Sequence, residues 1–270
     1  MPPNKTSLSI IIPTWNTAEI TLRCVNSIVK HLGKLVEIIV VDNGSTDSTQ
    51  DVLKKTTVKY VKLDKNYGYA TACNAGAKVA TSEYLLFLNS DMELIDKEVL
   101  AMVNFYKKNI NCGLVGPQFF NPDLSPQGSV FPPQTPLNAF REFWLHQKTF
   151  SKYFPKTDKP EKVWAISGGA VLISKKNYQS VGGWSQKYHM YYEDLDLCRQ
   201  TRNRGFSIYY FPSCRFIHRH GASGANIANA NNQWRRLING SKIYHGLFLH
   251  YLINLIIWSG QKWQKTFLKT

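Results

Sequence analysis

The sequence predicts an α/β fold: a Rossmann-like, mainly parallel central sheet with flanking helices, followed by a C-terminal helical extension. Short apolar runs recur through the first third of the chain, and segments with helical spacing of apolar residues separate them. Strands and helices that alternate at this pitch form parallel sheets with right-handed crossovers. The chain beyond about residue 225 is predicted to be helical, which gives the extension.

The elements expected in the first third follow one another in order. Apolar residues from Leu22 to Leu32 recur at helical spacing, and Gly33 ends that helix. Asp47 and Gln50 resemble a capping box that opens the second helix. The third strand alternates polar and apolar residues, so we expect it near an edge of the sheet. The expected strands are 8–12, 36–41, 58–63 and 85–88, and the expected helices are 22–32, 47–55, 70–80 and 96–109.

The middle of the chain is expected to be irregular. Eight of the twelve prolines lie between Pro117 and Pro160, so we expect a long excursion there with little regular structure. Order is expected to return at Val163, where the segment WAISGGAVLIS leads through two glycines into a strand. The segment YYEDLDLCRQTRNRG is then predicted to be a loop that feeds a helix, which Gly205 ends.

The composition indicates a globular, basic protein with reduced thiols. The chain has 270 residues, of which 43% are hydrophobic and 19% charged, and this excludes a disordered protein. The five cysteines are odd in number and include no CxxC pair, which argues against a disulfide framework and a structural zinc site. The net charge is +15, and residues 197–270 contain 11 Lys and Arg but no carboxylate, so we expect an anionic partner.

Polar residues follow each of the four expected strands at the point where the strand ends. Asp91 stands out among them, because it follows the buried run LLFL after only Asn89 and Ser90. Ligands of an open parallel sheet bind beyond the carboxyl ends of its strands. One such cluster would be explained by a helix cap or a turn, whereas four clusters at one edge favour a binding site. The clusters are residues 13–16, 42–45, 64–68 and 89–91.

Seven segments occur in an order that resembles one enzyme family. They are SIIIPTWN, EIIVVDNGSTDST, DKNYGYATACNAGA, NSD, SGGAVLIS, YYEDLDLCRQTR and FIHRHGAS. Together they resemble the family 2 glycosyltransferases, which have the GT-A fold, from about Leu8 to Ser223. Within that family the likeness is greatest to bacterial rhamnosyltransferases of cell-surface glycan assembly, which act on lipid-linked glycans. The resemblance implies a GT-A domain over residues 1–225 and leaves residues 226–270 as the helical extension.

The resemblance assigns a nucleotide-sugar donor to the strand ends. Asp42 would accept a hydrogen bond from the ring N–H of uracil or thymine, and a base without that donor would be rejected. Asn66, Gly68 and Asn74 match the family pattern Asn-x-Gly-x5-Asn, although an ordinary turn explains Gly68 equally well. The implied donor site consists of Pro13, Thr14, Trp15, Asn16, Asp42, Asn43, Gly44, Asn66, Gly68, Asn74, Asn89 and Ser90.

The resemblance also implies a divalent cation, Mg²⁺ or Mn²⁺. A nucleotide sugar releases a diphosphate, whose negative charge a hard cation held by carboxylates and phosphate oxygens can neutralise. Asp91 would hold the metal as the last residue of the family's Asp-x-Asp, in which Asn89 replaces the first aspartate. His218 matches a second family ligand, His220 is its rival, and a surface histidine remains an alternative for either.

The acid-base chemistry is assigned to the segment EDLD. Asp194, the second residue of the family's Glu-Asp pair, would take the proton of the acceptor hydroxyl, a step worth about 10²–10⁴-fold in rate. A single displacement with one base inverts the sugar carbon, so we expect inversion. Asp196 is expected instead to pair with Arg199 or to cap its helix. Trp184 could stack on a sugar or belong to the core. The implied acceptor side consists of Glu193, Gly168, Gly169 and Trp184.

The most apolar stretch of the chain, residues 247–258, is too short to cross a bilayer, which needs about 20 residues. Trp258, Trp263 and nearby lysines are typical of a helix that lies in a membrane surface. Packing on the domain or on a second subunit is the alternative. Because the lead from Met1 to Ser7 is polar, we expect a cytoplasmic protein, peripheral on the inner face of the cell membrane, with a lipid-diphosphate-linked glycan as acceptor.

Together these expectations describe an inverting, metal-dependent transferase with dTDP-L-rhamnose as donor. A UDP-hexose or UDP-N-acetylhexosamine donor is the first alternative. A nucleotidyltransferase would need a Gly-rich basic loop where the sequence has PTWNTAE. A nucleic-acid-binding protein would explain the charge but would not need EDLD, so we expect no nucleic-acid partner. The oligomeric state is left open, with a homodimer as one alternative.

Overall fold

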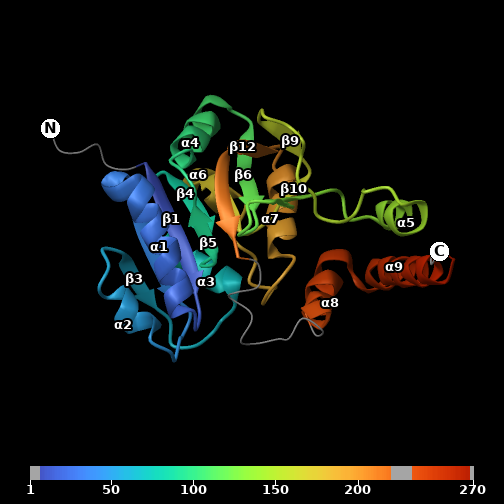
Figure 1. Ribbon diagram of the computed structural model, residues 1–270, viewed down its shortest axis with the longest axis horizontal. Helices are drawn as coiled ribbons and strands as arrows, with labels where there is room; N and C mark the ends of the chain where they lie inside the picture. The colour runs from blue at the N-terminus through green and yellow to red at the C-terminus, as the bar shows by residue number, and fades with distance from the viewer. Residues whose placement is uncertain (1–6, 220–232, 268–270) are drawn as a thin grey trace.

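One large sheet forms the centre of the computed structural model, which describes residues 7–219 and 233–267 (Figure 1). The strands are β1 (Leu8–Thr14), β2 (Glu37–Asp42), β3 (Lys59–Lys62), β4 (Tyr84–Leu88), β5 (Met92–Leu94), β6 (Cys112–Phe120), β7 (Pro126–Gln127), β8 (Val130–Phe131), β9 (Glu161–Val163), β10 (Ala165–Ile166), β11 (Ala170–Ser174) and β12 (Ser207–His218). The sheet has the order β3-β2-β1-β4-β11-β6-β12-β5, with β7 paired to β6 and β9 to β12. Strand β3 lies at an edge, as its alternating sequence predicts.

Helices cover both faces of this sheet. The helices of the described residues are α1 (Ala18–Leu32), α2 (Thr49–Leu53), α3 (Tyr69–Val79), α4 (Val99–Lys108), α5 (Pro136–Leu145), α6 (Lys175–Ser180), α7 (Glu193–Asn203), α8 (Gln233–His245) and α9 (Leu247–Phe267), with a 3-10 turn at Gly33–Leu35; the last two and α5 lie beside the sheet and not on its faces. Ile10 and Ile12 of β1 belong to a buried cluster with residues of α1 and α4, whereas Ile11 belongs to another with residues of α3 and α7. The predicted α/β fold is therefore confirmed, and β1 is buried on both faces as its continuous apolar run indicates.

Strand direction brings the site residues to one edge of the sheet. Strands β3, β2, β1 and β4 run parallel, so their carboxyl ends meet at the same edge, where Thr14 lies opposite Asp42. Strand β11 pairs antiparallel with β4, and Ala170 lies opposite Leu88. Strand β12 pairs antiparallel with β5, which places His218 opposite Met92. Segments that lie far apart in the sequence therefore start or end beside the residues that follow β4.

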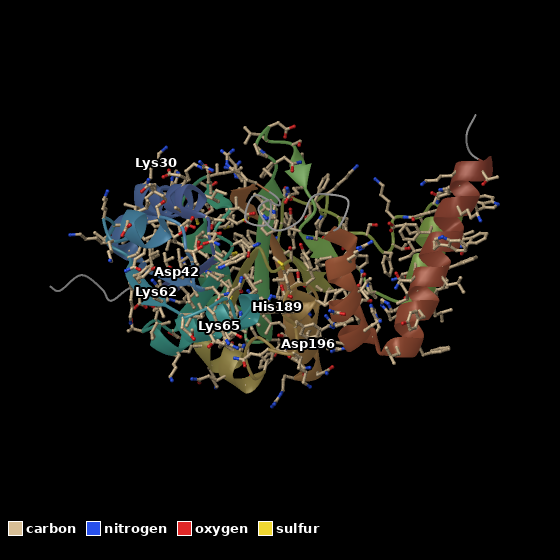
Figure 2. The ribbon with its side chains drawn as sticks, turned by 90° about the horizontal axis from the view of Figure 1, so that it is seen from below. Lys30, Asp42, Lys62, Lys65, His189 and Asp196 are labelled. Atoms are coloured by element: carbon tan, nitrogen blue, oxygen red, sulfur yellow. The ribbon has the colours of Figure 1, made fainter. Side chains whose placement is uncertain are left out.

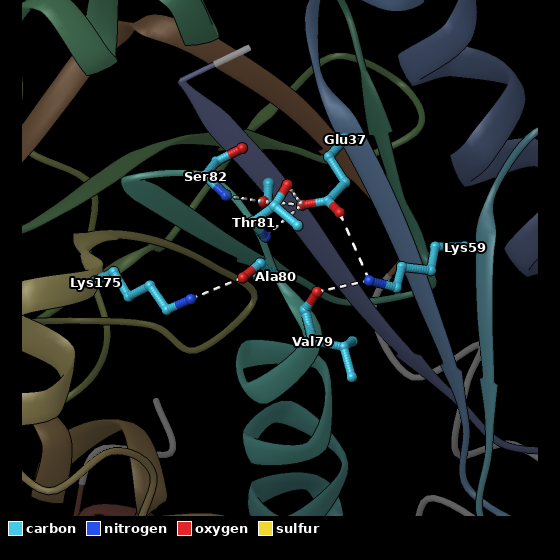
Figure 3. Close-up of polar contacts among 8 residues, drawn as sticks. Glu37, Lys59, Val79, Ala80, Thr81, Ser82 and Lys175 are labelled. Atoms are coloured by element: carbon cyan, nitrogen blue, oxygen red, sulfur yellow. Dashed lines mark hydrogen bonds and ion pairs between the residues drawn. The ribbon is translucent and has the colours of Figure 1, made fainter. Parts of the chain in front are cut away.

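The opposite edge is fixed by ammonium groups at the end of α3 (Figure 3). Lys59 Nζ donates a hydrogen bond of 2.7 Å to the carbonyl of Val79, and Lys175 Nζ donates one of 2.7 Å to the carbonyl of Ala80. The carboxylate of Glu37 lies 3.9 Å from the Lys59 ammonium. The last carbonyls of a helix have no partner within it, and cations there also complement the helix dipole. These contacts hold α3 between β2, β3 and α6 without using any residue of the candidate site.

The expectation of an irregular middle segment is wrong at β6 and α5, but it holds for residues 146–160, which form no helix and only one isolated β-bridge. Strand β6 continues through Pro117 to Phe120, and residues 136–145 form α5. Proline is a misleading signal here, because Pro136 lies in the first turn of α5, where a missing N–H breaks no helical hydrogen bond. Thr135 caps the same helix by accepting a 3.2 Å hydrogen bond from the N–H of Asn138.

The expectation of a capping box at α2 is also wrong. The carboxylate of Asp47 accepts from the N–H of Thr49 at 3.0 Å, while the N-cap residue Ser48 makes no side-chain cap. The side chain of Gln50 turns away from the helix start and accepts from Lys62 Nζ at 2.7 Å. Gln50 therefore joins α2 to β3, and Asp47 alone accepts from the backbone N–H at the start of the helix.

The C-terminal helices are present, and α9 packs against α5 rather than against the sheet, as Figure 1 shows. Trp144 Nε1 donates to the carbonyl of Ile256 at 3.3 Å, and the rings of Trp144 and Trp263 stack with centroids 5.8 Å apart. A Cβ on Gly260 would lie 2.6 Å from the carbonyl oxygen of Phe143, so only glycine permits this approach. Over residues 7–219 and 233–267, each helix lacks the combination of length and hydropathy needed to span a bilayer.

Candidate active site

A cavity of about 710 Å³ opens at the carboxyl ends of β1, β2 and β4. Its lining comes from the strand-end clusters, from the segment before α7 and from α8. Pro13, Thr14, Trp15, Asn43, Asn66, Gly68, Asn89 and Ser90 are the predicted donor-site residues that line it. The structure thus brings together eight residues that the sequence assigned to a donor site, and all four strand ends contribute.

The loop after β2 and the loop after β3 are joined by amide hydrogen bonds at this cavity. Asn43 Nδ2 donates to Asn66 Oδ1 at 3.0 Å and to the carbonyl of Gly68 at 3.2 Å, while Asn43 Oδ1 accepts from the N–H of Tyr67 at 3.0 Å. Gly68 has φ of +89°, and a Cβ there would lie 2.6 Å from the carbonyl oxygen of His189. Glycine is therefore required for the approach of two backbone segments at the cavity wall.

Asp42 and Asn16 lie at the strand ends but are absent from the cavity lining. Asp42 is fully buried; its Oδ1 accepts from the N–H of Ser45 at 2.8 Å and its Oδ2 from the hydroxyl of Tyr60. Burial and this carboxylate raise the pKa of Tyr60, so the phenol remains a donor. Asn16 Oδ1 accepts from the N–H of Thr46 at 2.8 Å. Both side chains hold loops together. Gly44 lets the loop after β2 pack against the loop after β3, because a Cβ at residue 44 would clash with the backbone of Lys65.

Asn74 and Trp184 face the core and not the cavity, which corrects their assignment to the site. Asn74 Nδ2 donates to the carbonyl of Trp184 at 2.8 Å, and its Oδ1 accepts from the N–H of Trp184 at 3.1 Å and from the hydroxyl of Tyr178. Trp184 is 1% exposed and meets Tyr69 and Phe87 edge to face, each at 5.4 Å. A ring enclosed in this way cannot stack on an acceptor sugar.

The segment after β4 meets the end of β12. Asp91 is 2% exposed, and its Oδ1 lies 3.5 Å from Nε2 of His218. His218 Nδ1 lies 2.5 Å from Gln127 Oε1, and Gln127 Nε2 donates to Asn121 Oδ1 at 2.7 Å. The amide oxygen of Gln127 can only accept, so Nδ1 of His218 carries a proton, and Nε2 is the ring nitrogen that faces Asp91. His220, the rival ligand, lies outside the described residues.

This pair fits a divalent cation. A buried carboxylate beside an imidazole nitrogen is a donor set that suits Mn²⁺ and similar ions. In the part of the chain that the structure describes, no three His, Cys, Asp or Glu side chains gather in a way that could enclose a metal. Two protein ligands leave the remaining coordination positions to phosphate oxygens and water, as is usual for cations that bind nucleotide phosphates.

The Glu-Asp pair opens α7 on the other side of the strand ends. Asp194 Oδ2 accepts a 3.0 Å hydrogen bond from the N–H of Gly168, and a Cβ on Gly168 would lie 3.2 Å from the Asp194 Cβ. The next residue, Gly169, accepts from the N–H of Asn89 at 2.9 Å. The backbone thus links the predicted base to the segment that carries Asp91. Gly168 permits the close approach, whereas Gly169 packs against the ring of Phe119.

Glu193 has a different environment from that of Asp194. It is 8% exposed, and its Oε2 is buried without a hydrogen-bond partner among the described residues. Burial, and to a smaller extent the charge of Asp194, raises the pKa of Glu193 from 4.5 to about 8. Burial therefore favours the protonated form of Glu193 near neutral pH.

Three cationic residues near the site were not foreseen from the sequence. Lys152 Nζ donates to Ser167 Oγ at 3.2 Å, and burial lowers its pKa against the opposing effect of Asp194. Lys187 and Lys242 line the cavity. None of the three lies in a recognisable motif, and the sequence offered only the excess of basic residues in 197–270, the range that contains Lys242. Asp196, by contrast, pairs with Arg199 as expected, although it is buried.

Replacement of Glu193 by Gln should change how stability depends on pH. Between pH 4.5 and about 8 the folded chain retains a proton that the unfolded chain has released, so the free energy of unfolding falls as the pH rises through this interval. In Glu193→Gln the free energy of unfolding should fall less over this pH interval, because glutamine does not bind or release a proton. Urea unfolding at pH 5 and pH 8 measures it, with Glu161→Gln, an exposed carboxyl, as control. An equal fall in the wild type and Glu193→Gln would contradict the assignment.

Known proteins resemble this chain in sequence. Residues 9–182 match glycosyl transferase family 2, and residues 148–221 match the N-terminal domain of galactosyltransferase. An N-acetylglucosaminyl-diphospho-decaprenol L-rhamnosyltransferase of Mycobacterium tuberculosis is 24% identical over 78% of this chain and 75% of its own length. A low-salt glycan biosynthesis hexosyltransferase of Haloferax volcanii is 24% identical over 74% of this chain and 63% of its own length.

Solved structures share the fold. A mannosyltransferase from Pyrobaculum calidifontis, in complex with GDP-Man and Mn²⁺, has a TM-score of 0.63 at 15% identity and covers 98% of this chain and 76% of its own. GalNAc-T7 with UDP, GalNAc and Mn²⁺ has a TM-score of 0.60 at 19% identity over 80% of this chain and 44% of its own. The fold is thus the GT-A fold. The match to the family covers most of the sheet and the strand-end wall of the cavity, and the chain belongs to glycosyltransferase family 2.

Proposed function

We propose that this glycosyltransferase moves a sugar from a pyrimidine nucleotide donor to a lipid-linked glycan, with a divalent cation and with inversion. One observation carries the proposal: the cavity lining includes Asn89 and Ser90, which directly precede the buried Asp91 opposite His218. The N–H of Asn89 also donates to the carbonyl of Gly169, and the neighbouring Gly168 donates to Asp194. The donor pocket, the metal ligands and the base are thereby held on neighbouring segments. This is the arrangement that a displacement at a nucleotide-sugar carbon requires.

The proposed donor is dTDP-L-rhamnose, and the support for it is the rhamnosyltransferase among the relatives. A UDP-hexose or UDP-N-acetylhexosamine is the alternative, supported by the UDP and GalNAc in one of the similar structures. Both alternatives share a pyrimidine whose ring N–H needs an acceptor. Asp42, which the resemblance assigned to this contact, is fully buried and absent from the cavity lining, so the acceptor would come from a residue of the lining itself.

Asp91 and His218 would hold the cation. When bound, the cation would supply charge neutralisation for the departing diphosphate. Gln127 keeps His218 in the tautomer that a metal ligand needs, through the 2.5 Å contact at Nδ1. Asn89, in place of the family's first aspartate, leaves a neutral amide at the cavity wall, and its Oδ1 has no hydrogen-bond partner among the described residues.

Asp194 would act as the base. Its Oδ2 is fixed by the N–H of Gly168, so the carboxylate keeps one orientation while it accepts the proton of the acceptor hydroxyl. Glu193 cannot share this role at neutral pH because it retains its own proton. A protonated Glu193 can instead donate to an acceptor oxygen, which suits a residue that orients the acceptor. With one base and a direct displacement, the product has inverted configuration at the sugar carbon.

The acceptor would be presented by a membrane, on which the protein would lie peripherally at the cytoplasmic face. Phe248, Tyr251, Leu255 and Trp258 of α9 are 78%, 59%, 58% and 59% exposed, and their spacing places them along one stripe of the helix. Residues 197–270 add 11 basic side chains and no carboxylate. An apolar stripe on a basic segment is what an anionic lipid surface binds. A second copy of the chain is the alternative occupant.

Asp194→Asn tests the proposed reaction. The variant should lose about 10²–10⁴-fold in the rate of sugar transfer, because its amide cannot take the hydroxyl proton, and should retain donor binding within about twofold. The measurement is release of nucleoside diphosphate from a panel of nucleotide sugars, with Mn²⁺ and a lipid extract as acceptor. Asp158→Asn, at an exposed carboxylate, is the matched control. Transfer by Asp194→Asn at the wild-type rate would exclude Asp194 as the base.

Asp91→Ala and His218→Ala test the metal site without reliance on activity. Each should weaken binding of Mn²⁺ about tenfold or more, since each removes one of two protein ligands. Electron paramagnetic resonance of free Mn²⁺ in the presence of UDP measures the affinity. Gln127→Ala should weaken it less, because it removes only the support of His218. Unchanged Mn²⁺ affinity in both ligand variants would contradict the site.

The double variant Phe248→Ser, Trp258→Ser tests the membrane surface. Loss of two apolar side chains from the contact should weaken binding to vesicles with anionic lipid tenfold or more, as measured by flotation. Ile110→Ser removes an apolar side chain that is 94% exposed on another part of the molecule, and it should bind as the wild type does. If the wild type is instead a dimer in solution that the double variant dissociates, the stripe is a subunit interface and the membrane proposal is wrong.

A further inference from the structure

The wall of the cavity opposite the strand ends is built by the C-terminal helix α8. Asn239, Gly240, Lys242 and Ile243 line the cavity from α8, and Lys187 to Met190 line it from the segment that precedes α7. Residues 226–270 were expected to be an appendage that serves membrane association. In the structure, the first helix of that extension instead completes the pocket that the strand ends begin.

Helix α8 is held firmly against the segment that leads into α7. A Cβ on Gly240 would lie 2.6 Å from the carbonyl oxygen of Tyr191, so the helix backbone approaches that segment as closely as glycine allows. Arg199 of α7 donates to the carbonyl of Tyr244 at 2.9 Å, and its guanidinium lies 4.2 Å from the centre of the Tyr244 ring. Tyr192 also contacts Tyr244, with ring centroids 5.5 Å apart. This packing fixes the position and rotation of α8, and so determines which of its side chains face the cavity.

The charge of the lining favours an anion. Lys187 and Lys242 are cationic, and no Asp or Glu belongs to the lining that the structure describes. Within the described ranges, neither lysine forms an ion pair, and the ammonium of Lys242 lies 5.4 Å from the centre of the Tyr251 ring. Two ammonium groups without carboxylate partners at one cavity raise the local concentration of a negatively charged ligand.

We propose that Lys242, assisted by Lys187 and Asn239, binds the diphosphate of the nucleotide-sugar donor, so that α8 is part of the donor site. The proposal rests on the function proposed above. A neutral sugar and a pyrimidine carry no charge, and the diphosphate is the only part of such a donor that needs a cation. Lysine binds phosphate as a mobile point charge, and the amide of Asn239 adds a hydrogen-bond donor. These groups would act beside the Asp91–His218 pair from the opposite wall.

A diphosphate could also come from the lipid-linked acceptor. The donor is favoured because the same cavity is lined by Asn43, Asn66 and Asn89, which stand at the strand ends where parallel sheets bind nucleotides. The predicted base, Asp194, is not among the lining residues. The two sources are distinguished by ligands that each contain only one of them.

Lys242→Gln tests the proposal by calorimetric titration with thymidine diphosphate, uridine diphosphate, thymidine and geranyl diphosphate, with Mn²⁺ and with EDTA. The affinity for the preferred nucleoside diphosphate should fall about tenfold or more under both conditions, and Lys242→Arg should restore most of it. The affinity for thymidine should not change, because a nucleoside has no phosphate. Lys30→Gln is the matched control, since Lys30 is an exposed lysine near the end of α1, away from His189 of the cavity lining (Figure 2).

Three outcomes would overturn the proposal. Wild-type affinity of Lys242→Gln for both nucleoside diphosphates would exclude the contact. An equal loss for thymidine would mean that Lys242 only supports the cavity wall. A loss confined to geranyl diphosphate would assign α8 to the acceptor. If the wild type itself binds neither nucleoside diphosphate, the proposed function fails, and this result is distinct from the other three.

Discussion

The hydrogen bond from the N–H of Asn89 to the carbonyl of Gly169, 2.9 Å long, joins the two halves of the site. On one side, two residues after Asn89, Asp91 faces His218. On the other, one residue before Gly169, Gly168 donates to Asp194. The bond extends the antiparallel pairing of β11 with β4 by one step beyond the strands. The distance between the proposed metal and the proposed base is therefore set by backbone geometry, and only the side-chain rotamers remain to be fixed by packing.

The sequence predicted the strand ends well because their signal is local. A buried strand needs a continuous apolar run, and the polar residue that ends the run is visible in the same few letters, as with Leu88 and Asn89. The proline-rich middle was predicted poorly because proline occurs in loops and also inside regular elements. Pro136 begins a helix and Pro117 lies inside a buried strand, and nothing within a few residues distinguishes these positions from a loop.

Some residues that the motifs assigned to the site have side chains that face elsewhere, because a motif does not specify side-chain direction or burial. Asn74 has the spacing of a ligand-binding amide, yet its helix rotates it toward Trp184, and both of its polar atoms are used there. The pKa of Glu193 is raised mainly because the folded chain buries it. The sequence alone therefore predicts the ordinary pKa of a glutamate. The cavity wall from α8 was missed for a similar reason, because the basic segment that contains Lys242 indicated an anionic partner but not where that partner binds.

Helices α8 and α9 are separated only by Gly246, which has φ of +77°, and this junction relates the cavity to the apolar stripe. Across it, His250 Nδ1 lies 2.8 Å from Ser241 Oγ, and Lys242 faces the ring of Tyr251. Tyr251 belongs to the exposed stripe, whereas Lys242 lines the cavity. A surface that binds the stripe of α9 would therefore contact Tyr251, whose ring lies against Lys242, the residue proposed to bind the diphosphate. Under the proposed function the acceptor would arrive at a membrane, and the orientation that brings it would also fix the helix proposed to complete the donor pocket.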